Sequence, residues 1–119
     1  MDSSDAKALS QRKCKPCEGG VAPLSEKEAR DYLQFLPGWE FEPAGGAIRK
    51  LFIMKHFMAA VQFIEKIAEV AEAEDHHPDL HLTGYRKLLI ELSTHAIKGL
   101  SENDFILASK IEDLPKELK

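Results

Sequence analysis

The sequence predicts an α+β fold of two layers, with a four-stranded antiparallel sheet and three helices packed on one of its faces, in the order α-β-β-α-β-β-α. Three observations predict it. Capping boxes at Ser25 and Ser101 mark the starts of the first and last helices. A long segment between them has apolar residues at helical spacing. The stretches that flank this segment alternate apolar and polar residues, as half-buried strands do.

Length and composition fit a single compact domain. The chain has 119 residues, 44% of them hydrophobic and 30% charged. A chain of this length can bury a core without the help of disulfide bonds or structural metal ions. The formal net charge of −4 argues against a nucleic-acid partner held through its phosphates. No apolar run approaches the roughly 20 residues that span a bilayer, and the acidic start is unlike a leader peptide. We therefore expect a cytoplasmic protein without membrane contact.

Residues 1–22 are predicted to form a mobile N-terminal arm, and residues 23–119 the folded domain. The arm shows no periodicity and carries Cys14 and Cys17 in a Cys-Lys-Pro-Cys motif. Two thiols are half of a structural zinc site, and no predicted strand precedes them, as a thioredoxin-like motif requires. We expect a reduced, solvent-exposed pair. Metal binding completed by histidines or by a second subunit is the alternative.

The first helix begins at the capping box of Ser25 and Glu28 and should run to about Leu36, because Pro37-Gly38 cannot continue it. Its apolar positions fall on one face: Ala29, Tyr32, Leu33 and Leu36.

A hairpin follows this helix. Trp39 and Phe41 alternate with glutamates, which is the period of a half-buried strand. Residues 43–46, Pro-Ala-Gly-Gly, form a turn, and a second strand is predicted over 47–54.

The central helix is predicted over 57–73. Its apolar stripe consists of Phe57, Ala60, Val61, Ile64, Ile67, Ala68 and Ala71. Pro78 cannot continue a helix, so His76 and His77 should lie just past its C-terminal end. There the helix carbonyls favour a protonated imidazole, and both histidines could be cationic caps and nothing more. His56 is expected at the start of this helix or on the surface.

A short extended piece at 80–82 and a turn at 83–84 lead to a long strand, predicted from Tyr85 to about His95. Ten residues of strand span roughly 33 Å. Tyr85 and His95 would then stand at opposite ends, so we expect Tyr85 to serve packing or an interface. The last helix opens at Ser101, and Asp104 caps it from the third helical position.

The spacing of the chemically distinctive residues resembles the signature of the pterin-4a-carbinolamine dehydratases. That signature is Glu72, His76-His77-Pro78, Tyr85, His95 and Asp104. Further stretches are similar to family sequences, namely Leu36-Pro37-Gly38-Trp39, Ser93-Thr94-His95-Ala96 and Gly99 to Phe105. The resemblance covers about residues 22–114.

The resemblance implies dehydration of 4a-hydroxytetrahydropterin to quinonoid dihydropterin, with no metal and no organic cofactor. Its active-site histidines are His76, His77 and His95. Loss of water needs one proton delivered to the leaving hydroxyl and one removed from a ring nitrogen, and imidazoles near their pKa suit both transfers. We expect His77 and His95 to transfer protons around C4a and N5, and His76 to anchor or polarise the pterin.

Four other residues are expected to bind substrate or to act as charge partners of the histidines: Glu72, Asp75, Pro78 and Asp104. Glu72 stands one helical turn before His76 and would favour its protonated form. Asp104 would do the same for His95. His81 is expected at most at the edge of the pocket.

Partners and alternative functions complete the expectations. The resemblance implies a homodimer or homotetramer, in which sheets pair edge to edge and helices join the dimers. Animal members of the family also act as dimerisation cofactors of a homeodomain transcription factor, so a protein-interaction module is one alternative. A metal protein that uses Cys14, Cys17 and some histidines is the other.

Overall fold

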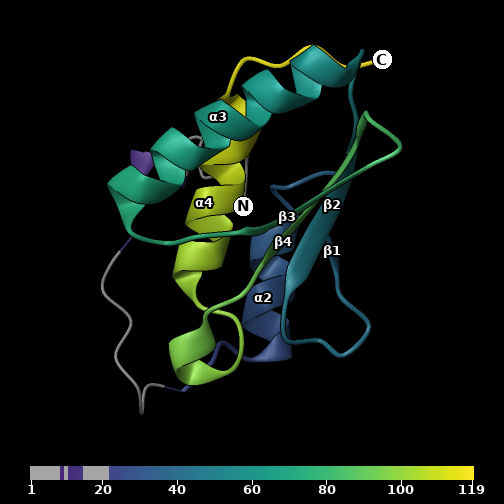
Figure 1. The fold of residues 1–119 in the computed structure, drawn as a ribbon. Coiled ribbons are helices and arrows are strands. Elements are labelled where there is room, and N and C mark those ends of the chain that lie inside the picture. The colour runs from purple at the N-terminus through teal and green to yellow at the C-terminus, as the bar shows by residue number, and fades with distance from the viewer. Residues whose placement is uncertain (1–8, 10, 15–21) are drawn as a thin grey trace.

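The computed structural model describes residues 9, 11–14 and 22–119. Figure 1 shows the elements in their predicted order. These are α2 (Glu26–Leu33), β1 (Glu40–Phe41), β2 (Ile48–Ile53), α3 (Phe57–Glu74), β3 (Asp79–Thr83), β4 (Lys87–Leu92), the 3-10 turn η1 (His95–Ile97) and α4 (Glu102–Asp113). The predicted α+β fold and element order are confirmed.

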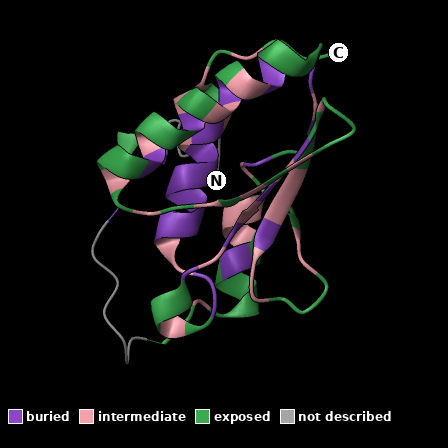
Figure 2. Ribbon diagram, viewed as in Figure 1, coloured by how far each residue is buried: buried purple, intermediate pink, exposed green. Residues whose placement is uncertain are grey.

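The four strands form one antiparallel sheet in the order β1-β2-β4-β3. Ile48 of β2 pairs with Leu92 of β4, and Phe52 with Leu88. These four side chains share one face of the sheet, since alternate residues of a strand point the same way, and all four are buried. Leu51, on the opposite face, is 51% exposed. Figure 2 shows the buried residues gathered between the sheet and the helices.

The core lies between this face and the helices. The ring of Phe63 in α3 meets Phe52 edge-on, with centroids 5.3 Å apart, and Tyr32 stacks on Phe105 of α4 at 5.0 Å. Eight residues of α4 are buried: Asn103, Asp104, Phe105, Ile106, Leu107, Ala108, Ser109 and Ile111. The last helix is therefore the most enclosed of the described helices.

Both predicted capping boxes are present. Glu28 N–H donates to the Ser25 hydroxyl at 3.2 Å, and Ser25 N–H donates to the Glu28 carboxylate at 3.0 Å. The box at Ser101 has Asp104 as its third-position acid. His56 begins α3, because its Nδ1 accepts a hydrogen bond from Ala59 N–H at 3.0 Å. The starts of α2, α3 and α4 were therefore predicted from local sequence.

The predicted apolar stripe of α3 is partly wrong. The buried residues are Ala59, Ala60, Phe63, Ile67 and Ala71. Phe57 is 52% exposed and Ala68 is also exposed. The helix carries apolar residues around more than half of its circumference, so helical spacing alone does not select the side that faces the sheet.

The predicted long strand from Tyr85 to His95 is also wrong at both ends. Gly84 and Tyr85 adopt left-handed conformations, with φ of 54° and 56°, so they form the turn between β3 and β4. At the other end Thr94 bridges Gly99, and the chain between them forms η1. His95 therefore lies in a loop, outside the sheet.

The described part of the N-terminal segment packs on the domain. Cys14 is 9% exposed, and its backbone N–H donates to Glu74 Oε1 at 2.7 Å. Arg12 forms an ion pair with Glu102 at 2.6 Å. The expected solvent exposure of the cysteines is thus wrong for Cys14, while Cys17 lies outside the described residues.

Candidate active site

His76 and His77 lie just beyond the C-terminal end of α3, as predicted. Asp75, the first residue after the helix, is left-handed with φ 52° and ψ 41°, and His76 N–H donates to the Ala71 carbonyl at 3.2 Å. Such an ending satisfies the last helix carbonyls and turns the chain sharply. The two adjacent imidazoles therefore reach different partners. Pro78 follows them and leads into β3.

His76 pairs with a fully buried carboxylate. Its Nε2 lies 2.7 Å from Oδ1 of Asp104, and the two side chains are 11% and 0% exposed. A carboxylate removed from water is stable only when hydrogen bonds and opposite charge replace its hydration. The pair joins the end of α3 to the start of α4, where the helix dipole also favours a negative charge.

The second oxygen of Asp104 has its own donors. Oδ2 accepts the Thr94 hydroxyl at 2.8 Å and the Ser101 backbone N–H at 3.0 Å. Asp104 therefore caps α4, as predicted, and also binds an imidazole. One carboxylate connects three segments: the end of α3, the loop after β4 and the start of α4.

His77 pairs with an exposed carboxylate. Its Nε2 is hydrogen-bonded to Oε2 of Glu72 in the last turn of α3, and the two side chains are 55% and 75% exposed. An exposed ion pair contributes little to stability, because water screens it. The contact instead orients the His77 ring at the surface.

These contacts correct the predicted charge partners. Glu72 pairs with His77 where His76 was expected, and Asp104 pairs with His76 where His95 was expected. Helical spacing failed because Asp75 breaks the helix before the histidines, so residues 76 and 77 no longer follow the i, i+4 rule.

His95 is the first residue of η1 and is exposed. The preceding residue, Thr94, is its anchor: Thr94 N–H donates to the Gly99 carbonyl at 2.8 Å, and the Thr94 hydroxyl binds Asp104. His95 therefore stands one residue along the chain from the network that holds His76.

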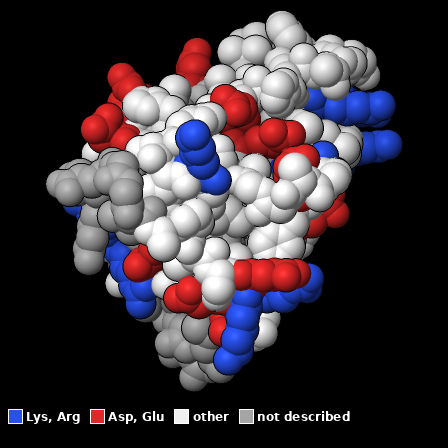
Figure 3. All heavy atoms as spheres, turned by 90° about the horizontal axis from the view of Figure 1, so that it is seen from below, with Lys and Arg blue, Asp and Glu red and all other residues white. Residues whose placement is uncertain are grey.

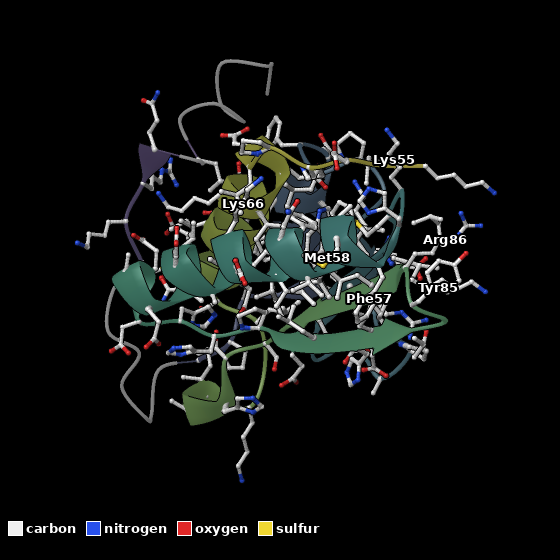
Figure 4. The ribbon with its side chains drawn as sticks, turned by 45° about the horizontal axis from the view of Figure 1, so that its top comes forward. Lys55, Phe57, Met58, Lys66, Tyr85 and Arg86 are labelled. Carbon is white, nitrogen blue, oxygen red and sulfur yellow. The ribbon has the colours of Figure 1, made fainter. Side chains whose placement is uncertain are left out.

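Tyr85 lies at the other end of β3 from the histidine pair. β3 begins directly after Pro78 and ends at Thr83, and the turn with Tyr85 follows. Five strand residues span roughly 16 Å. Tyr85 is 58% exposed, and Figure 4 shows it at the tip of the hairpin. Tyr85 is thus separated from the histidine pair, and its expected role in packing or an interface stays a prediction.

Two residues of this network were not predicted as site residues, namely Thr94 and Ser101. Ser101 was recognised only as a helix cap, and Thr94 only as part of a stretch similar to family sequences. Neither shows its contact with Asp104 in local spacing. The signal that could have found Thr94 is a hydroxyl directly before a predicted catalytic histidine.

A groove of about 590 Å³ lies beside the loop between β4 and α4. Its lining includes Pro23, Arg30, Phe41 and Lys98. None of the predicted site histidines lines this groove. Within residues 9, 11–14 and 22–119, no three His, Cys, Asp or Glu side chains are grouped so that they could hold a metal ion.

Known proteins resemble the chain over most of its length. Residues 22–114 match the family model of pterin 4 alpha carbinolamine dehydratase. A Methylococcus capsulatus protein, provisionally named pterin-4-alpha-carbinolamine dehydratase, is 42% identical over 95% of this chain and 98% of its own length. Pterin-4-alpha-carbinolamine dehydratase 2, mitochondrial, of Arabidopsis thaliana is 42% identical over 92% of this chain and 60% of its own. The crystal structure of a transcriptional coactivator/pterin dehydratase from Brucella melitensis has a TM-score of 0.72 at 33% identity, covering 76% of this chain and 95% of that one.

Proposed function

The chain belongs to the pterin 4 alpha carbinolamine dehydratase family and is a hydro-lyase, and we propose that it dehydrates 4a-hydroxytetrahydropterin by histidine acid/base catalysis. One observation carries the proposal. The buried Asp104 carboxylate holds His76 at 2.7 Å, beside a second imidazole, His77, that has its own carboxylate partner. Two oriented imidazoles on adjacent residues can act on one small ring, His77 by proton transfer and His76 by anchoring or polarising it.

The reaction needs proton transfer and no change of oxidation state. A proton is delivered to the hydroxyl at C4a, the C4a–O bond breaks, and water leaves. The N5 lone pair forms the C4a=N5 double bond, and the N5 proton is then lost to a base. One proton is taken up and one released, so a general acid and a general base are sufficient, each for about 10²–10⁴-fold.

The proposed roles follow the geometry. His77 and His95 are exposed, so they can reach a bound pterin and act as the proton-transfer groups at C4a and N5. His76 is largely enclosed against Asp104, which suits anchoring or polarising the ring. Asp75 and Pro78 remain proposed substrate contacts, because they flank the two histidines in the chain.

A stopped-flow absorbance assay of 4a-hydroxytetrahydropterin decay tests the proposal. The protein should accelerate decay over the spontaneous reaction, and decay at the spontaneous rate would end the enzymatic proposal. We also propose that no metal or organic cofactor takes part, since the elimination needs only proton transfers. Dialysis against EDTA should therefore leave the rate unchanged, and a loss restored by added metal would contradict this part.

We propose further that the chain forms a homodimer or homotetramer. Five large hydrophobic side chains of the described residues are exposed. Four of them come from segments that meet around Met54, namely Phe57, Met58, Tyr85 and Leu118. Met54 brings the segments together, because its N–H donates to Arg86 O at 2.8 Å and it bridges Leu118. Figure 4 shows Phe57 at the start of α3, beside the turn with Tyr85 and Arg86.

We call these four side chains the apolar corner. Exposed apolar patches of this kind mark interfaces. Within the described residues β3 is an edge strand of the sheet, and such edges can pair with another sheet. Analytical ultracentrifugation should show an oligomer for the wild type and smaller species for Phe57→Ser with Met58→Ser. Leu51→Ser, on the open sheet face, is the matched control. A monomeric wild type would contradict the proposal.

The alternative function is a protein-interaction module. It is favoured by the same apolar corner and by the Brucella melitensis relative, which is described as a coactivator as well as a dehydratase. Activity in the stopped-flow assay, together with a homo-oligomer that forms without another protein, would favour the enzyme. A stable complex with a helical partner and no activity would favour the module.

The proposed location is the cytoplasm, without a nucleic-acid partner. Figure 3 shows acidic and basic side chains mixed on the face seen from below, without an extended basic surface. In the part of the chain that the structure describes, no helix is long and apolar enough to cross a membrane. Fluorescence microscopy of the tagged full chain tests the location.

A further inference from the structure

We infer that Thr94 is a positioning residue for the dehydration, because its hydroxyl holds Asp104 so that His76 presents its Nδ1 atom to the pterin. The inference rests on the proposed function for the reaction itself, but its structural part does not. Thr94 is only 3% exposed and Asp104 is fully buried, so the hydroxyl binds a carboxylate that bulk solvent does not reach.

The proton directions in this network follow from the inventory of donors. The Thr94 hydroxyl has a single proton and donates it to Asp104 Oδ2 at 2.8 Å. The contact between the Thr94 and Ser101 hydroxyl oxygens, at 2.7 Å, must then take its proton from Ser101. Two hydroxyls in series therefore point toward the carboxylate, and such chains strengthen one another at low dielectric.

This arrangement divides the two oxygens of Asp104 between different tasks. Oδ2 accepts the Thr94 hydroxyl and the Ser101 N–H, and Oδ1 is left for Nε2 of His76. An ionised carboxylate only accepts hydrogen bonds, so Nε2 must carry a proton. In the neutral ring Nδ1 is then the acceptor, and the hydrogen bond at one nitrogen decides the role of the other.

Thr94 also anchors the loop that carries His95. Its N–H donates to the Gly99 carbonyl at 2.8 Å, and its carbonyl accepts from Ile97 N–H at 3.2 Å. The backbone of Thr94 therefore sets the loop, while its side chain sets the Asp104–His76 pair. Thr94 therefore fixes the position of the loop that carries His95 relative to the end of α3, which carries His76.

Thr94→Val and Thr94→Ser separate the hydroxyl from the shape of the side chain. Valine keeps the branched shape and removes the hydroxyl, and serine keeps the hydroxyl. Thr83→Val is the matched control, since Thr83 is exposed at the end of β3. In the full-length protein with ¹⁵N-labelled histidine, long-range proton–nitrogen NMR reports the tautomer of His76, assigned by comparison with His76→Gln.

We expect the neutral His76 ring to be protonated at Nε2 in the wild type, in Thr94→Ser and in Thr83→Val, and to be a mixture of tautomers in Thr94→Val. Turnover should fall about tenfold in Thr94→Val alone. A wild-type tautomer and rate in Thr94→Val would overturn the inference. So would a rate loss with an unchanged tautomer, because that pattern belongs to a purely structural residue. The tautomer is read without substrate, so it tests Thr94 even if the chain proves inactive as a dehydratase.

Discussion

At the scale of single residues, the Asp104 carboxylate accepts three hydrogen bonds: from His76, from the Thr94 hydroxyl and from the Ser101 backbone. The Ser101 contact starts α4, and the His76 contact orients an imidazole. A substitution that removes both contacts cannot tell the two roles apart. Isosteric variants can, because an amide oxygen still accepts hydrogen bonds without a charge.

Asp104→Asn should therefore keep the cap and lose the charge. We expect turnover to fall at least tenfold and the free energy of unfolding to fall by about 1–3 kcal/mol. Asp104→Ala should lose about 1 kcal/mol more, because the cap is also removed. Stopped-flow rates and urea unfolding measure the two effects. Full turnover in Asp104→Asn would show that the charge of Asp104 is dispensable.

His95→Ala should reduce turnover at least tenfold with folding preserved, because His95 is exposed and its removal opens no cavity. The melting temperature from circular dichroism checks the fold, and the stopped-flow assay checks the rate. His56→Asn is the control, since it keeps a capping side chain at the far end of α3. Unchanged turnover in His95→Ala would remove this residue from the mechanism.

At the scale of elements, the loop between β4 and α4 is held against the chain that enters α2. Leu24 N–H donates to the Leu100 carbonyl at 2.9 Å. A Cβ placed on Gly99 would lie 2.8 Å from Cβ of Pro23, which is closer than real contacts allow. Glycine at 99 lets the loop with His95 approach this segment.

Gly99→Ala should push that loop away from Pro23. We expect a loss of about 1–3 kcal/mol in the free energy of unfolding and a severalfold lower turnover. Gly46→Ala is the matched control, because nothing lies within 4 Å of a Cβ built there and its φ is not positive. Urea unfolding measures the stability of both variants, and the stopped-flow assay measures their turnover. Equal stability of the two variants would show that Pro23 can move aside for a Cβ at position 99 without cost.

At the scale of the whole molecule, residues near the N-terminus close over the ends of α3 and α4. Cys14 N–H binds Glu74, its thiol lies 3.7 Å from the Asn103 carbonyl, and Leu9 is 2% exposed. Burial, with a further contribution from the Glu74 charge, raises the pKa of the Cys14 thiol to about 12. The thiolate is the reactive form of cysteine, so the packed protein should protect this residue.

The protected thiol gives a prediction for alkaline pH. The pKa of the Cys14 thiol in the folded protein lies above the ordinary thiol value of 9.0. The contribution of the protonated thiol to the free energy of unfolding is therefore complete below about pH 9 and is lost as the pH rises toward 12. In a Cys17→Ser variant, a thiol reagent at mildly alkaline pH should label Cys14 at least tenfold more slowly in the native state than in denaturant. Equal labelling rates would mean that this segment does not stay packed.

Local sequence was enough to predict the element order, the capping boxes at Ser25 and Ser101, and the position of His76 and His77 beyond α3. Each of these depends on residues a few positions apart, and their backbone geometry is set by short-range hydrogen bonds and by Pro78. The family resemblance added the substrate class and the three histidines. The apolar spacing failed to predict the buried side of α3, because this helix also has an exposed apolar side that includes Phe57. The alternation pattern also failed to predict the turn around Tyr85.

Tertiary structure alone decided which carboxylate serves which imidazole. His76 and Asp104 are 28 residues apart, and they meet only because α3 and α4 pack on the same sheet face. The buried position of Cys14 likewise depends on contacts 60 and 89 residues away. The sequence by itself determined the end of α3, beyond which His76 and His77 lie, because that signal is local. The pairing that orients His76 is a long-range contact in a low-dielectric interior, and no spacing in the chain records it.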